Sequence, residues 1–256
     1  TEYFTLQTGQ AWRDVLGITL GTTDTEGSRL YAIANLPEGT DVSGIDTWDE
    51  FCEWAVTDTL IQRKYSADAL DNSSAEAYKD QLQAGKRFLM DGYYEFTREE
   101  DASNNSGTNH QVTVDLHRAA AKVRVNIYKA TSWTDADGNA VNINIEAIKA
   151  KISNYATTTQ VIAPEEGESL SDNGHVSTFA PLEAYDRDLA DPSGKEYLRS
   201  VLFYTFAHDW SNDLGHETTF IMNLPYTSGR DNNWYKIVFV PDGGQRYERN
   251  TFYEVD

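Results

Sequence analysis

The alternation of apolar and polar residues in the middle of the chain predicts two strand segments that bury opposite parities. Between residues 112 and 116 the apolar side chains occupy even positions, whereas between 119 and 127 they occupy odd positions. Strand side chains alternate between faces with a period of two, so this slip reverses the buried face. It falls at His117-Arg118, which indicates either a β-bulge or a chain that leaves one sheet and enters another.

The second segment is typical of a half-buried antiparallel strand, because Lys122, Arg124 and Asn126 interleave with its apolar positions. A polar segment rich in Asn, Ser and Gly, residues 101–109, precedes it. The sequence therefore predicts a domain boundary near residue 115, with domains 1–115 and 116–256. The predicted core residues of this strand are Val123, Val125 and Ile127.

A helix is predicted from Thr47, because Thr47 and Glu50 have the spacing of a capping box. Apolar residues then follow the spacing of one helix face: Trp48, Phe51, Cys52, Ala55, Val56 and Leu60. On this face Cys52 is predicted to be a buried, inert thiol. A second short helix is predicted from Ser73 to Gly85 by the same capping argument.

The remaining periodicity is that of strands, and the second half of the chain is almost purely β. The predicted strands are 12–20, 30–34, 87–96, 141–145, 148–152, 197–206, 218–224, 234–240 and 251–255. A parity change near Ala147 predicts another bulge. Residues 163–195 form a long polar surface excursion with room for a short helix or small strand. The predicted fold is mainly β, a β-sandwich architecture with a little helix in the first half.

Charge narrows the classes of partner. The chain has 41 acidic and 21 basic residues and a formal net charge of −20, which argues against nucleic acid and against an anionic membrane surface. No apolar run approaches the roughly 18 residues of a membrane span. Cys52 is the only cysteine, so neither an intramolecular disulfide nor a multi-cysteine zinc site is possible.

One acidic segment partly matches a calcium-binding loop. Asp135, Asp137, Asn139 and Glu146 occupy positions 1, 3, 5 and 12 of that pattern. The sixth position requires a glycine for the sharp turn, and here it is Ala140. A plain hairpin turn through Asp137-Gly138 explains the same residues and is the preferred interpretation.

A second cluster could hold zinc or a hard cation: His208, Asp209, Asp213, His216 and Glu217. Its spacing matches no helical ligand motif, so a solvated loop tip is the preferred interpretation. No nucleophile elbow, phosphate loop or dinucleotide fingerprint is present, and no carboxylate pair stands out for glycoside hydrolysis. The prediction is therefore a protein that is not an enzyme, with no catalytic, metal-binding or cofactor-binding residues and no cofactor.

Four fragments carry a family resemblance, in order along nearly the whole chain: Tyr31-Ala-Ile-Ala-Asn35, Phe88-Leu-Met-Asp-Gly92, Leu116-His-Arg-Ala-Ala-Ala-Lys-Val-Arg-Val125 and Tyr247-Glu-Arg-Asn-Thr-Phe-Tyr253. Together they resemble the fimbrillin family of Bacteroidales type V pili. The sequence departs from the family at both ends: it has no lipidated cysteine near Thr1, and it stops at Asp256, where family members usually run on into further strands.

The resemblance implies two tandem transthyretin-like β-sandwich domains, with one or two short helices in the N-terminal one. It also implies a structural or adhesive pilus subunit that is exported and attached to the outer membrane. Such subunits are trimmed by an arginine-specific protease and then assemble by β-strand exchange. The implied partners are neighbouring pilin subunits that supply a donor strand, and surface receptors or glycans. The polymerisation groove is not identified.

Two other hypotheses compete with this one. A surface glycan-binding β-sandwich module would use exposed aromatic rings, and Trp133, Trp210 and Trp234 lie in or beside predicted turns. Ordinary core or loop packing explains these residues equally simply and is preferred. A glycoside hydrolase domain is the weaker third hypothesis.

Overall fold

The computed structural model describes residues 29–37, 39–41, 43–57, 88–96, 112–164, 175–176, 179–182, 184–211, 215–226, 234–241 and 244–256. By its contacts the chain divides into two compact units, one made of 1–31 with 93–115 and the other of 32–92 with 116–256. The change of unit after Asp115 falls at the predicted boundary, but residues 32–92 group with the C-terminal half. The division into domains 1–115 and 116–256 therefore stays a prediction.

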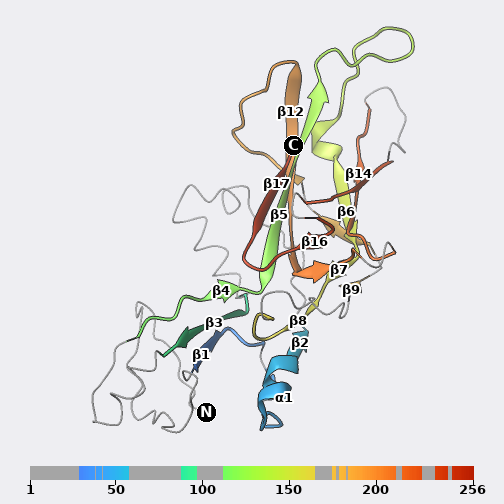
Figure 1. Ribbon diagram of the computed structural model, residues 1–256. Coiled ribbons are helices and arrows are strands. Elements are labelled where there is room, and N and C mark those ends of the chain that lie inside the picture. Colours follow the sequence, from blue (N-terminus) through green and yellow to red (C-terminus); the bar gives the residue numbers. More distant parts are fainter. Residues whose placement is uncertain are drawn as a thin grey trace. The chain divides into compact units, whose positions relative to one another are not determined.

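The N-terminal half contributes short elements: β1 (Arg29–Ala34), α1 (Trp48–Glu53), β2 (Ala55–Thr57) and β3 (Met90–Glu95). The next strand, β4 (His117–Arg118), joins β1 and β3 in a sheet of order β1-β3-β4, and β2 pairs with β8 (Thr158–Gln160). These small sheets are labelled in Figure 1.

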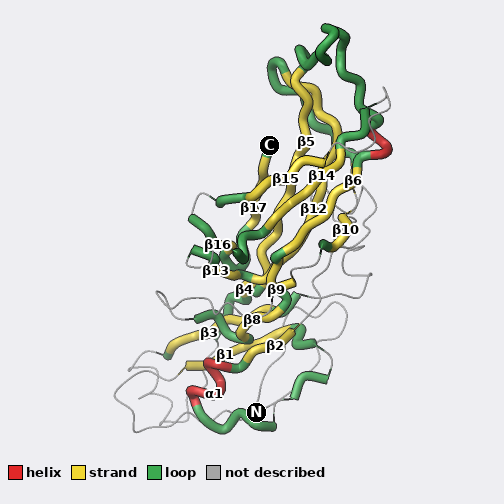
Figure 2. The backbone as a smooth tube through the Cα atoms, turned by 90° about the vertical axis from the view of Figure 1, so that its right-hand side faces the viewer, coloured by secondary structure: helices red, strands yellow, loops and turns green. Residues whose placement is uncertain are grey.

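Two larger sheets make up most of the second unit. The first has the order β17-β5-β12-β7-β9, with β11 also paired to β12. Its strands are β5 (Ala120–Ala130), β7 (Tyr155–Ala156), β9 (His175–Val176), β11 (Ala184–Tyr185), β12 (Lys195–Phe206) and β17 (Phe252–Val255). The second has the order β10-β6-β14-β15 (Figure 2), with strands β6 (Lys149–Ser153), β10 (Ala180–Leu182), β14 (Thr219–Asn223) and β15 (Trp234–Val238). A short pair, β13 (His208–Asp209) with β16 (Arg246–Tyr247), completes the fold.

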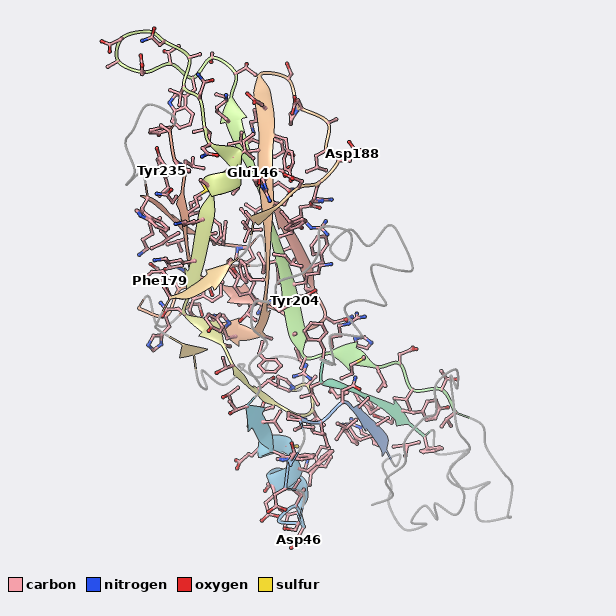
Figure 3. The ribbon with its side chains drawn as sticks, turned by 180° about the vertical axis from the view of Figure 1, so that it is seen from behind. Asp46, Glu146, Phe179, Asp188, Tyr204 and Tyr235 are labelled. Atoms are coloured by element: carbon pink, nitrogen blue, oxygen red, sulfur yellow. The ribbon has the colours of Figure 1, made fainter. Side chains whose placement is uncertain are left out.

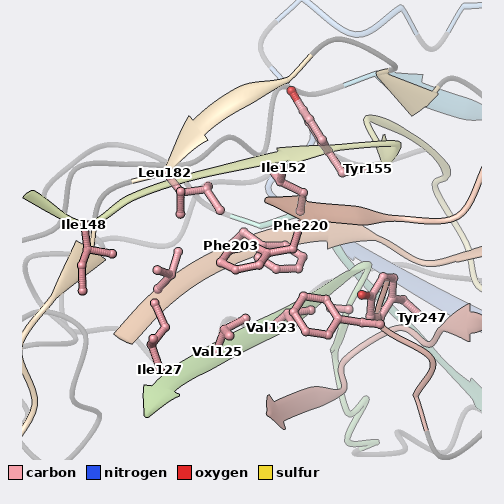
Figure 4. Close-up of a cluster of buried hydrophobic side chains, with 14 of the residues drawn as sticks. Val123, Val125, Ile127, Ile148, Ile152, Tyr155, Leu182, Phe203, Phe220 and Tyr247 are labelled. Carbon is pink, nitrogen blue, oxygen red and sulfur yellow. The ribbon is translucent and has the colours of Figure 1, made fainter. Parts of the chain in front are cut away.

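The hydrophobic core lies between these two sheets, which makes the fold a mainly-β sandwich (Figure 4). Val123, Val125 and Ile127 of β5 are 0%, 4% and 3% exposed, as their pattern predicts. Phe203 from one sheet and Phe220 from the other are both fully buried. Burial of each such side chain contributes about 1.5–3 kcal/mol to folding.

The parity slip marks a change of sheet. β4 pairs with β3, whereas β5 pairs with β12 and β17 in a different sheet. The change of sheet at the slip is therefore confirmed, and the bulge is wrong. The predicted strand segment 112–116 is also wrong: these residues lie outside any strand, and only the two residues of β4 pair before the chain enters β5. Two features of β5 differ from expectation: β17 pairs with it in parallel, and the polar residues Arg124 and Asn126 are buried.

The capping box is confirmed, because the Thr47 hydroxyl accepts from the Glu50 amide while Glu50 accepts from the Thr47 amide. The predicted length of the helix is wrong. α1 ends at Glu53, and the backbone turns extended at Trp54 because β2 pairs with β8. None of the helix residues is buried, and Cys52 is partly exposed rather than in the core. The predicted strand 12–20, Leu60 and the predicted helix 73–85 lie outside the described residues.

The predicted strand 141–145 is also wrong. It forms one isolated bridge, Ile143 with Tyr226, and then a 3-10 turn, η1 (Ile145–Ala147). That turn, instead of a bulge, produces the parity change predicted near Ala147. Six other strands are confirmed with small shifts at their ends: β1, β3, β6, β12, β14 and β15. β17 confirms the last predicted strand, and the excursion 163–195 contains the small strands β9, β10 and β11.

Candidate functional site

The calcium-like segment is a hydrogen-bonded turn. Asp135 Oδ1 accepts the backbone N–H groups of Asp137 and Asn139, both at 2.9 Å, and Gly138 adopts the left-handed φ of 81° that the turn requires. The hydrogen bond from the Asn139 backbone is the main cause that lowers the pKa of Asp135. Glu146 is engaged elsewhere, in an ion pair with Arg199 at 3.0 Å. The hairpin-turn interpretation accounts for these contacts.

The histidine cluster is not a solvated loop tip, and that prediction is wrong for His208. Its side chain is 2% exposed, and its ring packs 5.0 Å from Trp210 and 5.6 Å from Tyr247. The pairing of β13 with β16 draws this segment into the core. Asp213 lies outside the described residues. Among the residues described, no three His, Cys, Asp or Glu side chains are grouped to hold a metal ion.

The three candidate tryptophans have different environments. Trp210 is 1% exposed, so it is a core residue and cannot present a ring to a glycan. Trp133 packs partly buried against the core, edge-on to Tyr226 at 5.5 Å. Trp234 on β15 is 40% exposed. Of the three, only Trp234 presents a substantially open ring.

A buried ion pair between Arg249 and Asp91 joins two of the four fragments that carry the family resemblance. The Arg249 guanidinium also donates to Thr159 Oγ1 and to the Gln160 carbonyl, both at 3.1 Å. Asp91 in turn accepts the Ala163 amide at 2.6 Å. Burial lowers the pKa of Arg249, and Asp91 opposes that shift. This pair ties three distant segments together.

Two asparagines in the same fragments hold left-handed backbone. Asn35 (φ 61°) donates from its side chain to the Phe88 carbonyl at 2.9 Å. The side-chain carbonyl of Asn250 (φ 56°) accepts from the Arg118 backbone N–H at 3.4 Å. The backbone N–H of Asn250 donates to the Ala120 carbonyl at 3.1 Å. Asparagine tolerates this conformation better than most residues. In the sequence Asn35 and Asn250 carry only the family resemblance, whereas in the structure they hold turns of the backbone.

The candidate site for assembly is the edge of the four-stranded sheet at β15. β15 pairs with β14 on one side, and within the described residues no strand pairs with its other side. Trp234, Tyr235 (labelled in Figure 3) and Val238 are 40%, 37% and 36% exposed. An edge of this kind offers unpaired N–H and C=O groups to an added strand.

Two other outer strands of the sandwich, β10 and β17, are less suited to accept a strand. β10, at the opposite edge of that sheet, has only three residues, and Pro181 among them has no N–H to donate. β17, at the edge of the larger sheet, has four residues against five in β15, and its Glu254 is bound to Asn126 and Arg187. β15 has five residues, no proline and one charged side chain, Lys236.

β17 is also held by side chains. Glu254 Oε1 accepts from Arg187 at 2.8 Å and from Asn126 at 2.9 Å, and it lies 3.5 Å from Arg124. Burial alone would raise the pKa of Glu254, but the hydrogen bonds from Asn126 and Arg187 outweigh it, so the pKa is lowered. Asp256 accepts a second hydrogen bond from Asn126 at 2.9 Å. These contacts fix the strand to β5.

No protein-family model matches the sequence, and no curated protein matches it. Three solved structures are similar to the chain. The tip fimbrial protein Mfa3 from Porphyromonas gingivalis, with a C-terminal truncation, has 14% identity over 88% of this chain and 74% of that one, at a TM-score of 0.45.

The other two are each described as a "putative cell adhesion protein". The one from Bacteroides eggerthii has 17% identity over 93% of this chain and 71% of its own, at a TM-score of 0.47. The one from Bacteroides uniformis has 11% identity over 90% and 66%, at a TM-score of 0.41. Likeness at this level does not decide the function of this chain. Among the described helices, none has the length and apolarity needed to cross a membrane.

Proposed function

We propose that this chain is a structural and adhesive subunit of a cell-surface fimbria, and that it accepts a strand from a neighbouring subunit at β15. The observation that carries the proposal is the open edge of β15 with its exposed apolar side chains. Strand addition would satisfy the unpaired backbone groups and bury Tyr235 and Val238. The strongly negative net charge would hold unassembled subunits apart.

The remaining parts of the proposal follow the family that the four fragments resemble. The subunit is exported, attached to the outer membrane, and activated for strand exchange by an arginine-specific protease. Catalysis has no part in it. Two carboxylates of the calcium-like segment serve structural contacts, Asp135 in a turn and Glu146 with Arg199.

The test is assembly of the full-length chain before and after cleavage by an arginine-specific protease, followed by electrophoresis in SDS without heating. Strand exchange predicts an SDS-resistant ladder that appears only after cleavage. A chain that stays monomeric under every condition contradicts assembly by this route.

Proline variants test the β15 edge itself. Successive residues of an edge strand direct their N–H groups alternately toward the paired strand and toward the open side. One of the two variants Lys236→Pro and Ile237→Pro therefore removes only an N–H group that points to the open side. Thermal melting identifies this variant, because it keeps the stability of the unmodified protein. That variant should stop the ladder. An unchanged ladder would mean that the acceptor edge lies elsewhere.

A further inference from the structure

The outward face of the β10-β6-β14-β15 sheet carries lysines around one open indole ring. Ala150, Ile152 and Phe220 point into the core, being 2%, 0% and 0% exposed. Their neighbours along each strand therefore point to the opposite face. The register places Lys151, Ile221 and Lys236 in one row of that face, and Lys149, Asn223 and Trp234 in the next.

The indole of Trp234 lies across the middle strand of this face. The Nζ atom of Lys151 is 4.8 Å from the centre of the Trp234 ring, although β14 separates the strands that carry the two residues. Neighbouring strands are about 4.8 Å apart, so the ring must lean over β14 to come so close. Asn223, its partner on β14, is accordingly 5% exposed. Trp234 itself remains 40% exposed.

Few carboxylates lie near the lysines of this face among the residues that the structure describes. Lys149 and Lys151 are exposed, and no described carboxylate lies within ion-pair distance of either. Lys236 is 59% exposed in its side chain and has one long contact, 3.8 Å, to Glu217. In a chain of net charge −20 this is a local positive surface. Its chemistry suits an anion that also offers an apolar face to an indole.

We propose that this face, which we call the lysine–Trp234 face, binds a glycan that ends in one carboxylated sugar. The sugar ring would lie on the indole, and its carboxylate would pair with Lys149 and Lys151. A long polyanion fits less well. Its charges that lie farther from the lysines than the Debye length, about 8 Å at physiological salt, are not attracted by the rest of the protein. A second protein also fits less well, because lysine is depleted in the buried centre of protein interfaces.

Binding is tested on the full chain with sialyllactose and with a disaccharide that ends in glucuronic acid; lactose is the neutral control. We expect binding of at least one acidic probe in the millimolar range, weaker by about fivefold or more for lactose. Increasing NaCl from about 0.05 to about 0.5 M should weaken binding of the acidic probe in the unmodified protein, because the pairing charges are exposed.

Two variants test whether Trp234 and the two lysines bind the sugar, and each has a matched control. Trp234→Ala and the double change Lys149→Met with Lys151→Met should each weaken binding by about tenfold. Trp48→Ala removes another exposed tryptophan (49%), and Lys195→Met removes another lysine over an aromatic ring, that of Tyr128. Both controls should leave binding unchanged. The charge-conserving pair Lys149→Arg with Lys151→Arg should retain it, which separates a loss of charge from a loss of fold.

Four outcomes would overturn the proposal. These are no binding of either acidic probe, equal binding of lactose, unaltered binding by the Trp234 and lysine variants, and self-association that the lysine variants abolish, which would assign the face to a second copy of the chain. None of them bears on strand addition at β15, because the ladder assay requires no glycan.

Discussion

At the scale of single residues, the Asp91–Arg249 pair joins two of the four segments of the family resemblance, 88–92 and 247–253. The side chains of Arg249 and Asp91 are 9% and 6% exposed, so each charge depends on the other for its solvation. Arg249 also donates to the Gln160 carbonyl at the end of β8, and Asp91 accepts from the Ala163 amide. A polar pair at such a crossing specifies which segments meet, which apolar packing alone does not.

We predict that Asp91→Ala lowers the free energy of unfolding by about 3–5 kcal/mol, because it leaves the Arg249 guanidinium buried without its counter-ion. The double variant Asp91→Ala with Arg249→Leu should cost less than the single one, since it removes the stranded charge as well. Urea unfolding at neutral pH measures both. The matched control is Glu95→Ala, whose partner Arg29 is exposed; it should cost at most about 1 kcal/mol. Additive losses in the double variant would contradict the coupling.

At the scale of elements, β17 and β15 are both outer strands, but different contacts hold them in their sheets. β17 is parallel to β5 and is held by Glu254 among Arg187, Arg124 and Asn126. β15 is antiparallel to β14 and has exposed apolar side chains at its open edge. This contrast supports β15, and not β17, as the strand acceptor in the proposed assembly.

We predict that Glu254→Gln loosens β17 while the rest of the sandwich stays intact. The amide groups of residues 252–255 should exchange hydrogen about fivefold faster, which corresponds to about 1 kcal/mol for a partly exposed charge pair. Mass-spectrometric hydrogen exchange measures this. Glu248→Gln is the control, because Glu248 pairs with Arg246 where both side chains are about half exposed. Equal protection in the Glu254 variant would show that backbone pairing alone holds the strand.

At the scale of the whole molecule, the response to alkaline pH combines groups with opposite signs. Burial, with the nearby cations Arg124 and Arg118 as further causes, lowers the pKa of Lys122 to about 8, whereas the unfolded value is about 10.4. Between these values the unfolded state binds more protons, so this lysine makes stability rise with pH. Burial raises the pKa of Tyr185, Tyr197 and Tyr247. Above about pH 10 the unfolded state loses those protons first, so stability falls.

We predict that Lys122→Met is more stable than the unmodified protein at pH 7 and that this advantage disappears as the pH approaches about 10. The loss of stability above about pH 10 should remain, because the tyrosines are unchanged. Urea unfolding at a series of pH values measures the difference between the two proteins. A difference independent of pH would show that Lys122 does not titrate in this range.

How much of this could be predicted from the sequence depends on the range of the interaction. The capping box at Thr47 and the buried parity of Val123 and Val125 are local patterns, and both are confirmed. The end of α1 was missed because β2 pairs with β8, a partner about a hundred residues away. The prediction of a loop tip at His208 fails for the same reason, since pairing with Tyr247, 39 residues away in the sequence, brings it into the core. For Asp91 and Arg249 the sequence offered resemblance but no sign that they meet.

The sequence by itself determined the class of the fold, the approximate positions of the described strands of four or more residues and the buried face of β5, because alternation and capping act over a few residues. Tertiary structure alone decided which strands pair, that β17 runs parallel to β5, and that Arg124 and Asn126 are buried on the polar side of β5. It also decided that β10, β15 and β17 are outer strands of their sheets in the part of the chain that the structure describes, and that Lys149, Lys151 and Trp234 share one face. Pairing between distant strands depends on chain closure and on the register of whole sheets, which no local pattern contains.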